Sequence, residues 1–371
     1  MSAANYIGLW ALPLRHLDGG QRLLHSLFVK SAAGDGEAAP SPGYEALSSG
    51  CAVVGPSPEW RPSWLELSGV DRVRFLHGLV TCDVKALVVG QGTYGFFVDA
   101  KGKILADVVV SAREERLLLE LPENKAAELR AHLERFVVAD QVDVKEVGGT
   151  RSFVVGPGAD TLLQSLLFDD SVSNDSQAPK GWDARAIELV GESFLLRGER
   201  RLGVGAWIVR SDTETAMAAF LDTAATAGAV VASMADLETI RIEQGMPRAG
   251  VDFGEDHFPQ ETGLEEQAVS YTKGCYLGQE VVARIHYRGK VNHALRGVVA
   301  DKGDSLPSGS LLEDDEGNDA GRVTSGTFSR AQGHWIGLAI LHRRVAKAGR
   351  RLNLASRGSV AVVELPFAGR A

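Results

Sequence analysis

Cysteine is scarce in this chain of 371 residues, and the three that occur, Cys51, Cys82 and Cys275, form no CxxC pair. An odd number of widely spaced cysteines argues against a disulfide framework and predicts a reducing cytoplasm as the compartment. The same spacing is poor for a resident zinc or iron–sulfur site, which needs about four close ligands. We therefore expect no resident metal.

Long hydrophobic runs are also absent. The longest, such as ALVV and DVVV, fall far below the roughly 18 residues that a membrane-spanning helix requires. Residues 1–20 combine neither a basic leader nor a sustained apolar core, so we expect no signal peptide. These absences predict a cytoplasmic protein without a membrane partner.

Positive charge is in deficit, with 39 Lys and Arg against 48 Asp and Glu, for a net charge of −9. This balance argues against a bulk electrostatic grip on nucleic acid, although a local basic patch could still exist. Hydrophobic residues at 44% and charged residues at 23% are typical of a globular protein. The length allows two or three domains.

Nucleotide-binding motifs are missing as well. The stretch GPGADT carries Thr161 at the third glycine position of a dinucleotide fingerprint, and GVGAWI carries Ile208 there. No GxxxxGK[ST] run exists for phosphates. Ordinary turns explain both glycine pairs, so we expect no Rossmann cofactor site.

Two segments lack apolar periodicity and are rich in small residues and proline. Residues 31–43 predict a mobile surface loop, and residues 169–181 predict a linker that joins two structured halves.

Between these segments the pattern is that of an α+β unit. Residues 63–84 begin with a strand, followed by a helix that Ser68 could cap and that would bury Val70, Val73 and Leu76. Residues 92–122 predict three strands with tight turns. An amphipathic helix follows, with an apolar face of Ala126, Leu129, Leu133 and Phe136.

The second half repeats this theme loosely, without identity at a fixed period. Its predicted strands are 184–198 and 205–211, and its predicted helices are 214–229 and 234–250, the last breaking at Gly245 and Pro247.

After Lys290 the sequence changes to short strands separated by glycine, proline and acidic turns. This pattern suits a small antiparallel barrel of about 80 residues without a long helix. We therefore predict an α+β region at 1–290 and a β-barrel domain at 291–371.

The stretch SYTKGCYLGQEVVARIHYRGK places Cys275 among glycines and polar residues. Leu277, Val281 and Ile285 are spaced by four, which predicts a helix that starts near Gly278 with these residues inward. Lys273 and the helix start would both favour a thiolate at Cys275. The alternative is that Cys275 is a small packing residue in a glycine turn.

Three charged residues lie among apolar neighbours. Arg241 and Glu243 occur in a helical segment that contributes Leu237, Ile240 and Ile242 to the core, so they form either a buried or rim ion pair or a ligand site. Asp107 enters an apolar strand, where it faces either solvent or a polar ligand.

Three stretches together carry a family resemblance: KGCYLGQEVVAR, RIEQGMP and LHGLVTCDVKAL. They resemble the YgfZ-type folate-binding proteins, relatives of the glycine-cleavage T-protein (aminomethyltransferase) that are implicated in iron–sulfur cluster assembly or repair. Lys273 to Glu280 match the signature K-G-C-[FY]-x-G-Q-E, and Arg284 follows as the family expects. The resemblance runs from about Trp64 into the C-terminal barrel. It implies two α+β subdomains around a central cavity that admits tetrahydrofolate, followed by the barrel.

The resemblance also implies site residues. Arg241 matches an arginine suited to the glutamate tail of folate, and Glu243 matches the glutamate of the same family stretch. Asp107 and Gln279 are further candidates for cofactor binding, while Cys275 and Lys273 are the candidate catalytic pair. T-proteins carry an aspartate important for aminomethyl transfer where this chain has Ala106, and a pterin-binding glutamate that has no counterpart after Gly205.

These matches and departures favour a tetrahydrofolate-dependent accessory protein with iron–sulfur client or assembly proteins as partners. One alternative is an aminomethyl or one-carbon transferase, against which Ala106 speaks. The other is a non-catalytic folate-binding scaffold in which Cys275 only packs.

Overall fold

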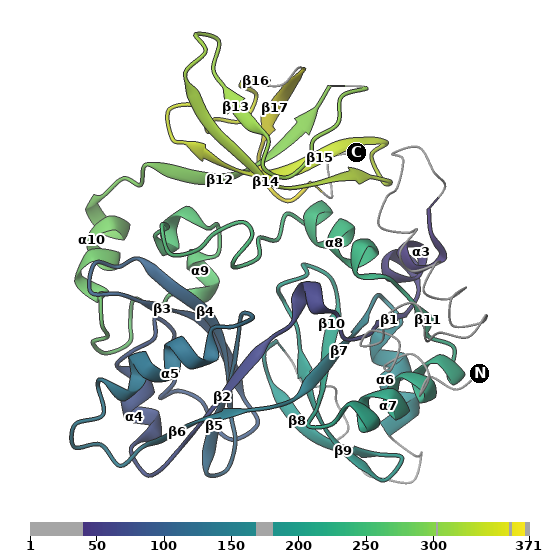
Figure 1. Cartoon of the computed structure of the whole chain (residues 1–371), viewed down its shortest axis with the longest axis vertical. Coiled ribbons are helices and arrows are strands. Elements are labelled where there is room, and N and C mark those ends of the chain that lie inside the picture. The colour runs from purple at the N-terminus through teal and green to yellow at the C-terminus, as the bar shows by residue number, and fades with distance from the viewer. Residues whose placement is uncertain (1–39, 168–180, 302, 356–357, 368–371) are drawn as a thin grey trace, which may run out of the picture. The chain divides into compact units, whose positions relative to one another are not determined.

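The computed structural model describes residues 40–167, 181–301, 303–355 and 358–367 (Figure 1). The chain divides into two units, one made of residues 1–61 and 148–240 and the other of residues 62–147 and 241–371. Each unit is therefore assembled from two separate stretches of sequence, and the boundary at 240 falls inside one helix. The predicted linker at 169–181 lies outside the described residues except for Gly181.

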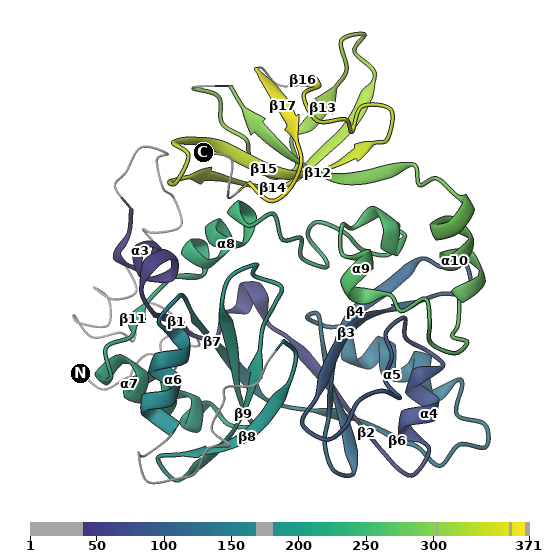
Figure 2. The ribbon, with the colours of Figure 1, turned by 180° about the vertical axis from the view of Figure 1, so that it is seen from behind.

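The first unit contains a six-stranded sheet in the order β11-β1-β7-β10-β9-β8, in which only the β1–β11 pair is parallel (Figures 1 and 2). The strands are β1 (Ala52–Val54), β7 (Thr150–Val155), β8 (Ala184–Leu189), β9 (Glu192–Gly198), β10 (Ala206–Ser211) and β11 (Val230–Val231). The helices are α3 (Pro42–Ser49), α6 (Ala159–Leu167), α7 (Glu214–Thr226) and α8 (Met234–Glu243), with a 3₁₀ turn η3 (Pro58–Trp60).

Side-chain alternation along β7 builds a core on each face of this sheet. Val154 packs with Leu163 of α6 and Phe220 of α7, whereas Phe153 packs in a second cluster with Leu47 of α3 and Leu237 of α8. The predicted strand at 205–211 and the predicted helices at 214–229 and 234–250 are confirmed, whereas the predicted strand at 184–198 is a hairpin of β8 and β9 that turns at Val190 and Gly191.

Helix α3 corrects the loop predicted at 31–43, of which only residues 40–43 are described. Pro42 and Gly43 belong to the helix, because Ser41 accepts the backbone N–H of Tyr44 at 3.0 Å and caps it. Proline is well suited to a first helical turn, whose N–H groups lack intrahelical partners in any case.

The second unit begins with a five-stranded antiparallel sheet in the order β3-β4-β5-β2-β6. Its strands are β2 (Ser63–Ser68), β3 (Gly92–Val98), β4 (Ile104–Ala112), β5 (Arg116–Leu121) and β6 (Asp143–Val147), with helices α4 (Arg72–His77) and α5 (Ala126–Glu134). The three strands predicted within 92–122 and their turns are confirmed. Buried residues of both helices and of the sheet form one hydrophobic cluster.

The prediction for the start of α4 was wrong in two respects. Ser68 is the last residue of β2, and Asp71 occupies the N-cap position. Val70 is 77% exposed. The cause is Gly69, whose positive φ of 98° turns the chain and delays the helix, so that only Val73 and Leu76 reach the core. Phe136 likewise lies beyond the end of α5 and is 38% exposed.

The C-terminal strands close into a barrel in the order β12-β15-β14-β13-β16-β17, and every pairing is antiparallel. The strands are β12 (His293–Ala300), β13 (Leu311–Glu313), β14 (Asp319–Ser329), β15 (His334–His342), β16 (Arg351–Leu354) and β17 (Ser359–Val363). The predicted antiparallel barrel is confirmed. The sequence did not reveal β13, because three residues beside acidic turns carry no alternation.

Short helices connect the sheet of the second unit to the barrel: η4 (Pro259–Glu261), α9 (Glu265–Ala268) and α10 (Gln279–Arg288). Within the described part of the chain, no helix is both long and apolar enough to cross a bilayer.

Candidate functional site

The loop that carries Cys275 is attached to the segment after α4. Ser270 N–H donates to the carbonyl of Thr81 at 2.9 Å, and Leu277 N–H donates to the carbonyl of Gly78 at 3.0 Å. Backbone hydrogen bonds at both ends of the loop, at Ser270 and at Leu277, therefore hold it against residues 78–81. These segments are the ones that the stretches LHGLVTCDVKAL and KGCYLGQEVVAR identified in the sequence.

Lys273 forms the central contact between these segments. Its buried ammonium group donates to the carbonyls of His77 and Val80 at 2.6 Å each and of Cys82 at 2.8 Å. The ammonium also lies 5.0 Å from the centre of the Tyr276 ring. Burial lowers the pKa of Lys273 to about 8. Lys273 thus stabilises the turn that follows α4, and its ammonium hydrogens are used in hydrogen bonds to the carbonyls of that turn.

Cys275 is exposed, whereas Cys51 is half-buried and Cys82 is buried. Burial raises the pKa of Cys82 to about 11 and also raises the pKa of Cys51. All three cysteines of the chain lie in the described residues, so Cys275 is the one thiol with open access to solvent. The alternative that Cys275 is buried packing does not fit this exposure.

Helix α10 begins at Gln279 after the N-cap residue Gly278, as predicted. Gly278 has φ of 80°, and a Cβ there would stand 2.3 Å from the carbonyl oxygen of Asp99, so the position requires glycine. The predicted inward stripe needs correction. Val282 is the fully buried residue of α10, while Leu277, Val281 and Ile285 are only half-buried.

Gln279 is half-buried at the first position of α10, and its backbone N–H donates to the Tyr276 carbonyl at 3.1 Å. The Tyr276 hydroxyl is buried and has no hydrogen-bond partner among the described residues. Burial raises the pKa of Tyr276, so the hydroxyl remains protonated.

His77 is a neighbour of this loop that sequence reasoning missed. A Cβ at Gly274 would stand 3.5 Å from His77 Nε2, which places the imidazole edge against the residue before Cys275. The His77 Nδ1 lies 3.4 Å from Asp83 Oδ1. Burial and then the charge of Lys273 lower the pKa of His77. The sequence signal that could have identified His77 was its position within LHGLVTCDVKAL, one of the stretches that carry the family resemblance.

Arg241 is fully buried, and its guanidinium makes a 2.8 Å ion pair with Asp252. It also donates to the Met246 carbonyl at 2.5 Å and to Ser325 Oγ at 2.9 Å. The other oxygen of Asp252 accepts from Thr324 at 2.5 Å and Ser325 at 2.7 Å. Of the two alternatives for Arg241, the structure shows the buried ion pair, and the partner is Asp252.

Glu243 is buried and accepts a 2.6 Å hydrogen bond from Ser329 Oγ. Because Ser325 and Ser329 both belong to β14, Arg241 and Glu243 bond the end of α8 to the barrel. Both predicted residues therefore contact the same barrel strand, β14.

Asp107 is buried at 4% exposure and accepts a 3.0 Å hydrogen bond from the Tyr94 hydroxyl. The alternative that Asp107 faces solvent is therefore wrong. Its neighbour Ala106 points to the opposite face of β4 and packs in the hydrophobic cluster of the sheet.

The sequence matches two known domains. Residues 63–273 match the GCVT N-terminal domain, and residues 294–368 match the glycine cleavage T-protein C-terminal barrel domain. The chain belongs to the GCVT family. The resemblance drawn from its motifs is confirmed, and so is the α+β architecture with a terminal antiparallel barrel, which the structure shows to have six strands.

Among its relatives, this GCVT-family chain is similar to the tRNA-modifying protein YgfZ of Yersinia pseudotuberculosis (strain IP 31758), with 28% identity over 311 residues that cover 81% of this chain and 88% of the relative. The tRNA-modifying protein YgfZ of Yersinia enterocolitica is 30% identical over 245 residues, which cover 62% of this chain and 66% of the relative. The fold is that of the glycine cleavage system aminomethyltransferase T from Bartonella henselae, with a TM-score of 0.75 and 18% identity over 93% of this chain and 96% of that one.

Proposed function

We propose that this GCVT-family protein is a cytoplasmic, tetrahydrofolate-dependent accessory factor that supports the assembly or repair of iron–sulfur clusters. Cys275 is the residue that contacts the cluster or a client thiol. The observation that carries the proposal is the contrast between an exposed Cys275 and the less accessible Cys51 and Cys82. The clients include proteins of tRNA modification, the process after which the Yersinia relatives are named.

The loop geometry suits a transient thiolate ligand. A thiolate is a soft ligand that binds iron after its proton has passed to water, and the contact breaks when a client thiolate replaces it. Lys273 and Gly278 fix the two sides of the loop, so the sulfur is presented from a constant position.

The residues predicted to bind tetrahydrofolate fit this cofactor unevenly. Arg241 has its charge neutralised by Asp252 in a fully buried pair, and Glu243 is bonded to Ser329, so both act in support of the fold. Asp107 is the carboxylate that we assign to the amide edge of the pterin, with Tyr94 holding its orientation. Gln279 is the remaining polar candidate. Bound tetrahydrofolate would supply the one-carbon carrier that the family's transfer chemistry uses.

A transferase reaction is the less favoured function. It needs a carboxylate where this chain has Ala106, and that side chain lies in the hydrophobic cluster of the sheet. The scaffold alternative requires Cys275 to be inert, which its exposure does not favour.

The role of Cys275 can be tested by complementation, in cells from which the chromosomal gene for this protein has been deleted. We expect Cys275→Ser to lower the specific activity of a cluster-dependent enzyme toward the level of the deletion, while the matched variant Cys51→Ser restores wild-type activity. Both variants are compared by thermal unfolding to establish that they fold. Full support of the cluster enzyme by a folded Cys275→Ser variant would refute the role of the thiol.

Titration of the purified protein with tetrahydrofolate tests the cofactor separately. Asp107→Asn keeps the size of the side chain and its acceptor oxygen but removes the charge, and we expect it to weaken folate binding about 5-fold or more. Unchanged affinity would exclude Asp107 from the pterin site. Production of methylenetetrahydrofolate from an aminomethyl donor would instead establish the transferase.

A further inference from the structure

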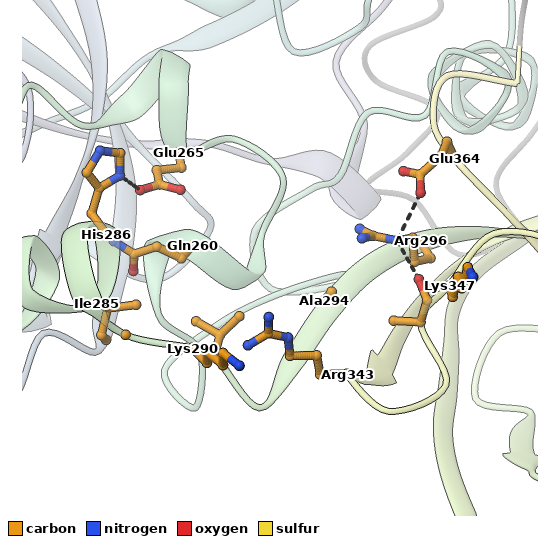
Figure 3. A pocket seen from close by; sticks show the side chains of 13 residues that line it. Gln260, Glu265, Ile285, His286, Lys290, Ala294, Arg296, Arg343, Lys347 and Glu364 are labelled. Carbon is orange, nitrogen blue, oxygen red and sulfur yellow. Dashed lines mark hydrogen bonds and ion pairs between the residues drawn. The ribbon is translucent and has the colours of Figure 1, made fainter.

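A groove in the second unit has a lining that includes neither Cys275 nor any residue assigned to folate. It has a volume of about 550 Å³ and is lined by the end of α10, the start of β12 and the segment after β15 (Figure 3). The backbone N–H of Arg343 donates to the carbonyl of Asn292 at 2.8 Å, which joins the segment before β12 to the segment after β15.

The groove is basic although the whole chain is acidic. Its charged lining comprises Lys290, Arg296, Arg343, Lys347, His286, Glu265 and Glu364. The side chains of Lys290, Arg343 and Lys347 are exposed, and none makes a hydrogen bond or ion pair with any residue that the structure describes. Three unpaired cations in one groove leave local positive charge for a ligand to neutralise.

Arg296 is a prearranged donor in the same groove. Its Nε donates to the Ala346 carbonyl and its Nη1 to the Leu295 carbonyl, both at 2.8 Å, which holds the guanidinium in one orientation. Glu364 lies 3.7 Å from Nε and leaves the other edge of the guanidinium without a carboxylate. A fixed guanidinium edge matches the oxygens of a phosphate.

His286 of α10 lines the groove, and two tyrosine rings pack against it. Tyr271 stacks on His286 with ring centres 3.8 Å apart and an interplanar angle of 22°. Tyr287 packs edge-on against His286 at 4.8 Å and is itself 67% exposed. Glu265 accepts from both the Tyr271 hydroxyl and the His286 ring, at 2.5 and 2.7 Å, so the acidic side chain is used to hold the rings.

We propose that this groove binds single-stranded nucleic acid, with phosphates on Lys290, Arg296, Arg343 and Lys347 and a base stacked on the exposed ring of Tyr287. Cations along an open groove, with an exposed aromatic ring packed against a residue of its lining, are the arrangement that single strands favour. An acidic peptide would use the cations but would leave the aromatic ring without a partner. This site is independent of the proposed folate and thiol function.

Fluorescence anisotropy with labelled 20-nucleotide rU and dT strands tests the proposal, and the two strands report the sugar preference. Four phosphate contacts to a single strand give a salt slope of about −3, so affinity falls roughly 50-fold between 50 and 200 mM salt. The variant Lys290→Glu/Arg343→Glu/Lys347→Glu removes most binding and reduces the slope below about 1. Tyr287→Ala weakens binding about 5-fold or more.

The matched control is Arg61→Glu/Arg135→Glu/Arg200→Glu, which makes the same charge change at exposed positions outside the groove. It retains wild-type affinity, and thermal unfolding establishes that both triple variants fold. The proposal is overturned if neither strand binds at 50 mM salt or if the control loses as much affinity as the groove variant. It is also overturned if a duplex binds better than either strand, or if polyglutamate displaces the probe as well as unlabelled strand does.

Discussion

Arg241 and Asp252 form a 2.8 Å ion pair in which both side chains are completely shielded from solvent. Asp252 also accepts from Thr324 and Ser325, so one carboxylate connects the loop after α8 to the barrel strand β14. A buried charge whose partner is removed is strongly destabilising, because the remaining charge cannot be hydrated.

We therefore expect Asp252→Ala to lower the free energy of unfolding by about 3–5 kcal/mol. The matched control is Arg116→Ala, which breaks the partly exposed pair with Glu66 and should cost less than about 1 kcal/mol. Urea denaturation followed by tryptophan fluorescence measures both. Equal losses for the two variants would show that the buried pair is not a stability determinant.

Lys273 gives a prediction on pH. Its pKa is about 8 in the folded protein, below the ordinary value of 10.5, so between these values the unfolded chain binds more protons than the folded protein. Stability contributed by this group therefore rises as the pH increases from about 8 to 10.5. Relative to Lys273→Met, which cannot titrate, the wild type should gain on the order of 1–3 kcal/mol over that window.

Denaturation of both proteins at pH 7.5, 9 and 10.5 measures this difference, and other titrating groups cancel in the comparison. At pH 7.5 the variant also leaves three carbonyls without a donor. A wild-type advantage that shrinks with rising pH would contradict the burial of the ammonium group.

Gly278 should not tolerate a side chain. Gly278→Ala combines a left-handed backbone conformation, which costs about 1–2 kcal/mol, with a Cβ 2.3 Å from the Asp99 carbonyl oxygen. Gly317→Ala separates the two effects, since Gly317 has a similar φ of 78° and no atom within 4 Å of its Cβ position. We expect a clearly larger fall in melting temperature for Gly278→Ala, and equal falls would argue against the close approach of α10 to Asp99.

The three thiols should react in the order of their exposure. Iodoacetamide at neutral pH is expected to label Cys275 first, Cys51 more slowly, and Cys82 only on the timescale of unfolding, because Cys82 is buried and its pKa is about 11. Peptide mass spectrometry of timed samples gives the three rates. Rapid labelling of Cys82 would mean that the turn after α4 opens readily.

The sequence predicted what depends on local patterns. Period-two alternation predicted β2, β3, β4, β5 and β10 and most of the barrel, but not the short strands β1, β6 and β11. The motif around Cys275 predicted the family and the start of α10. It could not predict contacts between distant segments: Asp252 as the partner of Arg241, or the three carbonyls that accept from Lys273. Ser68 failed as a helix cap because one glycine with positive φ shifted the helix by several residues.

During synthesis on the ribosome, the sequence of the first unit is completed before that of the second. The first unit has its whole sequence once residue 240 has been made, but residues 62–147 must wait for the segment that begins at 241. The carbonyl of His77 can accept its hydrogen bond from Lys273 only after a further 196 residues have been synthesised. A nascent chain therefore carries an incomplete second unit until its last third emerges, which is the interval in which a chaperone would be of most use to it.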